Sequence, residues 1–230
     1  MSENHGSDSW LSLGLAFVGG YCDAAGFVLA KTFTGHITGA LVLAAIDLAA
    51  RDWQPFLRNI LAITLFLAGG GLILISEQFI GSTPSRFLLS IVMAVELVLI
   101  LGAYFALSSE LTVKVGLFVC CLSLALGLQN GAFTKAGGIS VHTTYLTGLI
   151  TALFETEAEK QNPQTTAGST PSSGQKAKLL GEIWLAFVVG ATVGAAIVLW
   201  IGARGLAGAA LPLLAMVIVQ IAPGRAEAKP

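Results

Sequence analysis

Residues 86–107 read RFLLSIVMAVELVLILGAYFAL, an apolar run interrupted at its centre by one acidic residue, Glu96. About 20 consecutive apolar residues in a helix are enough to cross the hydrocarbon core of a bilayer. Comparable runs recur along the chain, and of its 230 residues 55% are hydrophobic and only 11% are charged. Water-soluble domains do not have this balance. The sequence therefore predicts an integral membrane protein that crosses the bilayer several times.

The apolar runs predict an all-α polytopic bundle of eight helical segments, of which the second and the sixth are short. These segments span residues 10–30, 35–50, 56–76, 86–107, 112–131, 141–154, 179–202 and 206–222. They leave no room for a soluble domain, so residues 1–230 form a single membrane domain. Residues 1–9 and 223–230 are predicted to be polar tails. Residues 155–178, which are rich in Ser, Thr, Gln, Gly and Pro, are predicted to be a flexible cytoplasmic linker.

The two short segments decide the number of crossings, because each either crosses the bilayer or enters it and returns. Lys and Arg concentrate on the cytoplasmic side of membrane proteins. If all eight segments cross, eight of the 12 basic residues share one side, and the other side holds Lys31, Arg86, Lys135 and Arg204. If the short segments are re-entrant, the division is seven against five. This bias favours eight crossings with both termini in the cytoplasm.

The two halves of the chain resemble each other, which predicts an internal duplication of four segments each. Gly20-Tyr-Cys-Asp23 aligns with Gly127-Leu-Gln-Asn130, and Phe66-Leu-Ala-Gly69 with Phe187-Val-Val-Gly190. Between these blocks, Thr34-Gly-His-Ile-Thr38-Gly39 aligns with Thr143-Thr-Tyr-Leu-Thr147-Gly148. An even number of crossings per repeat makes the repeats parallel, whereas re-entrant short segments make them inverted. Eight crossings therefore favour parallel repeats.

Two motif blocks resemble the YoaK-like family of bacterial multi-pass membrane proteins, whose function is uncharacterised. The first block is Gly20-Tyr-Cys-Asp23-Ala-Ala-Gly-Phe27 followed by Thr38-Gly39. The second combines Gly127-Leu-Gln129-Asn130, Lys135, Gly137-Gly138 and Thr143-Thr144-Tyr145-Leu-Thr147-Gly148. The sequence departs from the family at His36, where members often have a small or apolar residue, and at Gly131, which replaces Ala. The resemblance spans nearly the whole chain and implies a helical bundle in the bacterial cytoplasmic (inner) membrane. It implies no activity, substrate or cofactor.

Two acidic residues lie inside apolar runs, where an ionised carboxylate is costly unless it meets a partner, a cavity or a cation. Asp23 either belongs to a binding site or pairs with Lys31, His36 or the backbone and merely holds the bundle together. Glu96 is too deep in its helix to reach the membrane surface. It is therefore protonated, paired with a base from another helix, or part of a proton or cation path, and we assign it to proton coupling.

Polar residues and glycines also gather where the two short helices begin. A helix start inside a membrane offers free N–H groups and the positive end of the helix dipole to a polar solute. We therefore predict a substrate-binding site formed by Asp23, Lys31, Thr34, His36, Thr38, Gly39, Gln129, Asn130, Lys135, His142, Thr143, Thr144, Tyr145, Thr147 and Gly148. Close helix packing is the alternative for the faces Gly35-x-x-x-Gly39, Gly127-x-x-x-Gly131 and Gly190-x-x-x-Gly194.

Three classes of function are compatible with these residues. A transporter or channel for a small polar solute or ion is favoured. A non-catalytic scaffold that binds a partner or a second copy of itself comes next, followed by an intramembrane enzyme, because the sequence has no enzyme signature. We expect no catalytic residue, cofactor, metal site or disulfide. A formal charge of −1 gives no footprint of a nucleic-acid binder. The expected partners are the lipid bilayer and a small polar solute or ion, and a homo-oligomer is left open.

Overall fold

The structure, a computed structural model, describes residues 3–80, 86–109, 113–133, 135–136, 139–140 and 173–221, with side chains for 9–76, 88–109, 113–133 and 177–221. Apart from a two-stranded ladder, its elements are helical. They are α1 (Glu3–Ala30), α2 (Ile37–Ala49), α3 (Trp53–Ile80), α4 (Arg86–Ser108), α5 (Lys114–Ala132), β1 (Lys135–Ala136), β2 (Ile139–Ser140), α7 (Ser173–Ile201), the 3-10 helix η2 (Gly202–Ala209) and α8 (Ala210–Ile221). These helices match seven predicted segments. The segment predicted at 141–154 lies outside the described residues.

Two helices begin inside stretches that were predicted to be polar. The helix α1 begins at Glu3, inside the predicted tail 1–9, and α7 begins at Ser173, inside the predicted linker 155–178. Polar residues such as Glu, Gln and Lys are good helix formers, so a helix continues into polar sequence beyond the membrane. The rest of the linker and the tail 223–230 lie outside the described residues.

The helices α1 and α7 lie side by side and run in the same direction. Gly190 of α7 faces the backbone of Phe17, and Gly194, one turn later, faces Tyr21. A Cβ atom at either glycine would overlap the neighbouring backbone. Small residues of this kind let two membrane helices approach closely, so the predicted packing face of α7 is confirmed.

The helices α3 and α5 form a second parallel pair of the same kind. Gly127 of α5 faces the backbone of Phe66, and Gly131 faces Gly70, one turn further along α3. The packing face predicted for α5 is therefore also confirmed. Gly35 and Gly39 do not form such a face, because α2 begins at Ile37 and Gly35 precedes it.

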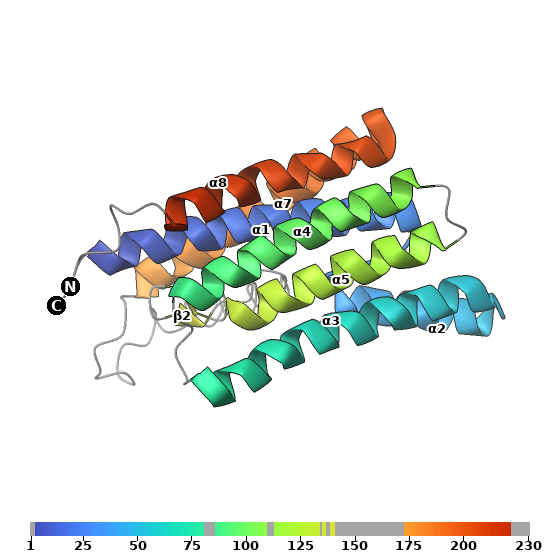
Figure 1. The fold of residues 1–230 in the computed structure, drawn as a ribbon, viewed down its shortest axis with the longest axis horizontal. Coiled ribbons are helices and arrows are strands. Elements are labelled where there is room, and N and C mark those ends of the chain that lie inside the picture. The colour runs from blue at the N-terminus through green and yellow to red at the C-terminus, as the bar shows by residue number, and fades with distance from the viewer. Residues whose placement is uncertain are drawn as a thin grey trace.

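The helix α1 runs antiparallel to α5, and therefore also to α3. The amide Nε2 of Gln129 donates a hydrogen bond of 3.0 Å to the carbonyl of Leu15. One turn earlier on α5, Leu126 packs against Gly35, which is bonded to Asp23. Moving forward along α5 thus means moving backward along α1, as the ribbons in Figure 1 show.

These directions do not confirm the expectation that the second segment crosses the bilayer. Because α1 and α3 are antiparallel, α1 ends and α3 begins at the same end of the bundle, and the short helix α2 lies between them in the chain (Figure 1). The 13 residues of α2 rise about 20 Å, less than the hydrocarbon core of about 30 Å. A difference of one basic residue per side was too small a signal to decide the topology.

The chain reverses once more between α7 and α8. Gly202 has a φ of 66°, a left-handed conformation that suits glycine, and η2 leads into α8. Met216 of α8 packs on Gly14, and the Tyr21 hydroxyl donates a hydrogen bond to the Gly205 carbonyl. The helix α8 is therefore antiparallel to α1. In Figure 1 the start of α1 and the end of α8 lie at the same end of the bundle.

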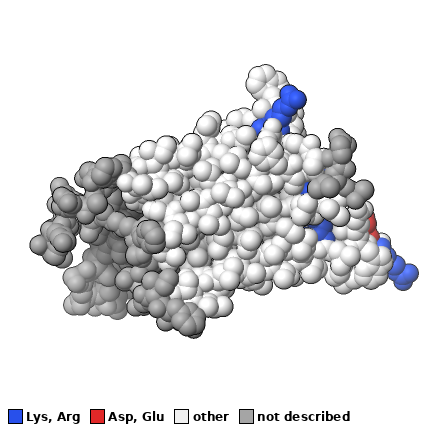
Figure 2. All heavy atoms as spheres, in the orientation of Figure 1, with Lys and Arg blue, Asp and Glu red and all other residues white. Residues whose placement is uncertain are grey.

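The outer surface of the described bundle suits a lipid environment. Five helical stretches are long and apolar enough to cross a membrane, and the last of them, residues 177–221, contains both α7 and α8. Large apolar side chains face outward, and Trp200 is 86% exposed. Figure 2 shows an uncharged surface along the described helices, with the visible charged side chains gathered at the end opposite the start of α1.

Candidate functional site

The candidate site lies where the chain breaks between α1 and α2. Lys31 follows the last residue of α1 with a φ of 55°, and its N–H still bonds the Phe27 carbonyl at 2.9 Å. This left-handed residue turns the chain back on itself. Residues 32–36 then run back along α1 to the level of Asp23, seven residues before the end of α1 at Ala30, or about 10 Å along the helix. The helix α2 consequently starts inside the bundle.

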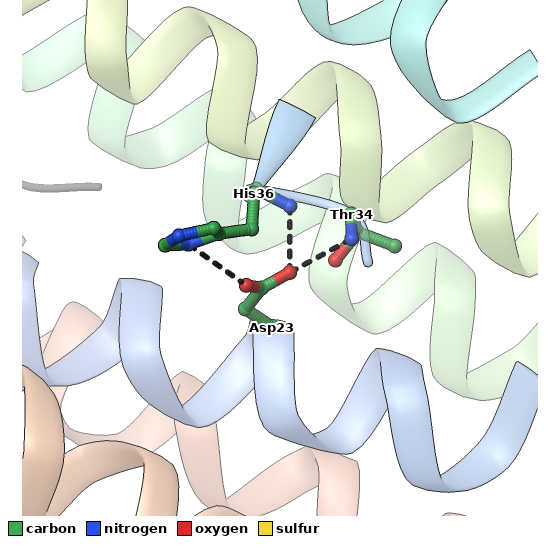
Figure 3. A network of polar contacts seen from close by, with 4 residues as sticks. Asp23, Thr34 and His36 are labelled. Atoms are coloured by element: carbon green, nitrogen blue, oxygen red, sulfur yellow. Dashed lines mark hydrogen bonds and ion pairs between the residues drawn. The ribbon is translucent and has the colours of Figure 1, made fainter. Parts of the chain in front are cut away.

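Asp23 fastens the break to α1. Its Oδ1 atom accepts hydrogen bonds of 2.8 Å from the N–H of Thr34 and of 2.8 Å from the N–H of Gly35 (Figure 3). The residue is only 5% exposed. Hydrogen bonds to charged acceptors are shorter and stronger than neutral ones, and they offset part of the cost of burying the carboxylate. Two otherwise unpaired backbone donors are satisfied at the same time.

His36 completes this cluster on the side of Asp23 that faces α7. Its Nδ1 atom lies 3.7 Å from Asp23 Oδ2, and its side chain is 30% exposed. The imidazole ring is tilted against the rings of Phe33 and of Phe187 on α7. His36 is also the residue before the first turn of α2, and its carbonyl accepts the Ala40 N–H. It therefore links the start of α2 to Asp23.

The remaining residues predicted around this break have different surroundings. Thr34 is buried against Gly26, and its hydroxyl has no hydrogen-bond partner among the described residues. Thr38 is exposed on α2, and Gly39 packs against Phe33. The structure thus brings Asp23, Thr34 and His36 together, whereas Thr38 and Gly39 lie outside this cluster.

Lys31 also lies outside the cluster. Its side chain is exposed, and its Nζ atom is 5.6 Å from the centre of the Phe27 ring. This distance is typical of a cation–π contact. Lys31 was one of the expected partners of Asp23. In the structure Asp23 pairs instead with His36 and the backbone.

The polar pair at the end of α5 divides between two environments. Gln129 is buried and donates to the Leu15 carbonyl, so it ties α5 to α1 two turns before Asp23. Asn130 is partly exposed. In the second break, the strand β1 packs against α1 and includes Lys135. The other predicted residues, His142, Thr143, Thr144, Tyr145, Thr147 and Gly148, lie outside the described residues.

Glu96 occupies a separate position deep in the bundle. It is 0% exposed and shares a face of α4 with Met93 and Ile100. Among the described residues, neither of its carboxyl oxygens has a hydrogen-bond partner. Cys22 lies within electrostatic range of Glu96. Two neighbouring residues of α1 therefore lie near different polar groups. Asp23 contacts the break, and Cys22 lies near Glu96.

Sequence reasoning allowed for a backbone partner of Asp23 but did not identify which backbone groups complete these contacts. The N–H of Gly35, the carbonyl of Leu15 and the carbonyl of Gly205 each bond a side chain that is distant in sequence. No residue type marks a backbone donor or acceptor, so only the fold reveals them. Within the described ranges, no three His, Cys, Asp or Glu side chains lie close enough together to hold a metal ion.

Comparison with known proteins identifies the family of this chain. Neither the curated proteins nor the solved structures contain a match. One family model matches residues 11–219, a range that includes α2, α3, α4, α5 and α7 in full and most of α1 and α8. The chain belongs to the DUF1275 family, whose description is 'protein of unknown function'.

Proposed function

We propose that this protein is a membrane transporter or channel for a small polar solute or ion. The observation that carries this proposal is the start of α2, which is held inside the bundle by bonds from Thr34 and Gly35 to Asp23. Broken helices whose positive ends lie within the membrane are a recurrent feature of solute sites in transporters. The solute would bind where Asp23, Thr34 and His36 meet.

Matched contacts in the two halves support an internal duplication of four segments each. Gly20 of α1 meets Phe187 of α7, and the aligned residue Gly127 of α5 meets Phe66 of α3. The first helix of each half thus packs against the third helix of the other half. Equivalent helices run in opposite directions, as α1 and α5 do, so the repeats are inverted. This arrangement is common among secondary transporters.

The same topology leads us to propose an orientation in the bacterial inner membrane. With both short segments re-entrant, seven basic residues share the side of the termini, and the other side has Lys31, Arg51, Arg58, Lys114 and Arg204. The excess of Lys and Arg favours a cytoplasmic location for both termini. The motif blocks that resemble YoaK-like proteins lie inside the family match and support the narrower family assignment.

A thermal-shift screen of the purified protein tests the proposed site. The probes are amino acids, nucleosides, monosaccharides, organic anions and inorganic ions, each added singly. A ligand present at 100 times its Kd stabilises the folded state by about 2.7 kcal/mol. We expect a probe that raises the Tm of the natural protein and does not raise that of Asp23→Asn. Asp47→Asn is the matched control, because Asp47 lies on α2, the helix whose start Asp23 fastens, and accepts a hydrogen bond of 2.8 Å from the amide of Asn59.

Each outcome of the screen has a distinct meaning. A probe that still stabilises Asp23→Asn would place the solute site away from the break. A probe lost from both variants would point to a general weakening of α2. No stabilising probe for the natural protein would contradict the transporter proposal.

A non-catalytic scaffold is the second candidate, and one observation favours it. The Asp23 carboxylate is already bonded to Thr34, Gly35 and His36, as expected of a residue that fastens the bundle. A scaffold needs no exchange of these bonds during function. It would keep its partner when Asp23 is replaced, provided that the fold survives.

A further inference from the structure

Glu96 differs from Asp23, the other buried acid in the described part of the chain, because no described polar group forms a hydrogen bond with its carboxyl group. Asp23 has two backbone donors and His36. Glu96 is 0% exposed, and its two oxygens have no hydrogen-bond partner among the described residues. An ionised carboxylate in such surroundings costs several kcal/mol even after relaxation. The surroundings therefore favour the neutral acid.

Its depth in the bundle excludes contact with the membrane surface. The helix α4 spans Arg86–Ser108, so Glu96 is ten residues from its start and twelve from its end, or about 15 Å and about 18 Å along the helix. A glutamate side chain is far too short to cover either distance. Any proton on Glu96 must arrive through the protein.

Among the described residues, the elements packed on α4 supply no base or cation near Glu96. The helix α8 has no charged residue, and the one charged residue of η2, Arg204, is exposed. On α5, Lys114 is the first residue of the helix, and Cys121 lies against Gly102, nearly two turns from Glu96. No ion pair to Glu96 is therefore formed from these elements.

From α1, the titratable side chain within electrostatic range of Glu96 is the buried thiol of Cys22. The next residue, Asp23, turns its carboxylate to the break. A metal ion is a poor occupant, because hard cations take several oxygen ligands and the described residues contain no metal-binding group of three. A proton needs only the one carboxyl.

We propose that Glu96 is the proton-carrying group of this protein and that it couples proton movement to the solute site at the break. In the structure described here it holds the proton on a carboxyl oxygen. When the two repeats rearrange and admit water, the O–H bond breaks, the proton passes to a water molecule, and the carboxylate remains. Protonation from the opposite side restores the neutral acid. The coupling rests on the proposed transport function, whereas the protonation of Glu96 does not.

The experiment is infrared spectroscopy of the natural protein in lipid vesicles at neutral pH. A neutral carboxylic acid gives a carbonyl stretch above the backbone amide band, and an ionised carboxylate does not. We expect this band in the natural protein and in Asp23→Asn, and its loss in Glu96→Gln, whose amide has nearly the same shape. Exchange into D2O should lower the frequency of the band, because a carried proton exchanges with solvent.

Two results would overturn the proposal. If the natural protein has no acid band that Glu96→Gln removes, Glu96 is ionised. If the band is present but does not shift after prolonged exposure to D2O, the proton is permanently trapped and Glu96 is only structural. Should Glu96→Gln fail to fold, Glu96→Asp serves as the second variant and should move the band rather than abolish it. The ligand screen fails or succeeds independently of these results.

Discussion

Asp23 accepts a 2.8 Å hydrogen bond from the backbone N–H of Gly35, twelve residues further along the chain. This bond holds residues 32–36 against α1. The helix α2 therefore begins at the level of Asp23 rather than at the end of α1. The bond thereby sets the depth at which a helix start and its free N–H groups lie. One carboxylate defines both the re-entrant fold and the candidate site.

Removing this carboxylate should destabilise the protein. Asp23→Ala leaves the buried N–H groups of Thr34 and Gly35 without an acceptor, at about 1–3 kcal/mol for each group. Asp23→Asn retains one acceptor oxygen, so it should lose less. Thermal unfolding followed by tryptophan fluorescence should rank the natural protein first, then Asp23→Asn, then Asp23→Ala. An unchanged Tm for Asp23→Ala would show that the backbone bonds do not hold the break.

Replacing the histidine of this cluster should have a much smaller effect. His36 Nδ1 is 3.7 Å from Asp23, and the side chain is 30% exposed, so solvent weakens the pair. Partly exposed ion pairs contribute about 1 kcal/mol or less. We expect His36→Ala to lower the free energy of unfolding by no more than that amount. A loss as large as that of Asp23→Ala would mean that His36 and the backbone share the anchoring of α2 equally.

The sequence was sufficient to identify the helices and the buried acids. Long apolar runs identified six of the described helices, and Asp23 and Glu96 stood out because charge is rare in such runs. The direction of α2 was not predictable in the same way. It depends on bonds from Asp23 to backbone N–H groups, which leave no pattern in residue types, and on a charge bias that differed by a single residue between two topologies.

Proximity in sequence also misled the prediction of the site. Thr38 lies only two residues after His36 but is exposed on the outer side of α2, because successive residues of a helix point in different directions. Gly39 lies on α2 and packs on Phe33, which lies in the break just before this helix. By contrast, Cys22 and Glu96, from different helices, come within electrostatic range only through the packing of the bundle.

Glycines at the helix contacts should tolerate no side chain. A Cβ atom at Gly127 would overlap the Phe66 backbone, whereas one at Gly71 would meet nothing within 4 Å. Gly127→Ala should therefore destabilise the protein by about 1–3 kcal/mol through overpacking. Gly71→Ala is the matched control and should be neutral or stabilising by up to about 1 kcal/mol, because alanine favours a helix. Equal effects of the two substitutions on the Tm would contradict the close approach of α3 and α5.

The re-entrant path of α2 predicts which surface residues share a side of the membrane. We expect Lys31→Cys and Arg51→Cys, which flank α2, to react with a membrane-impermeant maleimide from the same side, together with Arg204→Cys. Lys178→Cys, near the start of α7, should react only from the opposite side. Lys31 already has a left-handed φ, so exchanging its side chain for that of cysteine adds little strain.

The background for this labelling is the protein with alanine at the native cysteines, Cys22, Cys120 and Cys121, which form no disulfide. Right-side-out and inverted vesicles give the two directions of access. If α2 crossed the bilayer, Arg51→Cys would be labelled from the side of Lys178→Cys. Labelling of Arg51→Cys from that side would mean an even number of crossings in each repeat. The repeats would then be parallel rather than inverted.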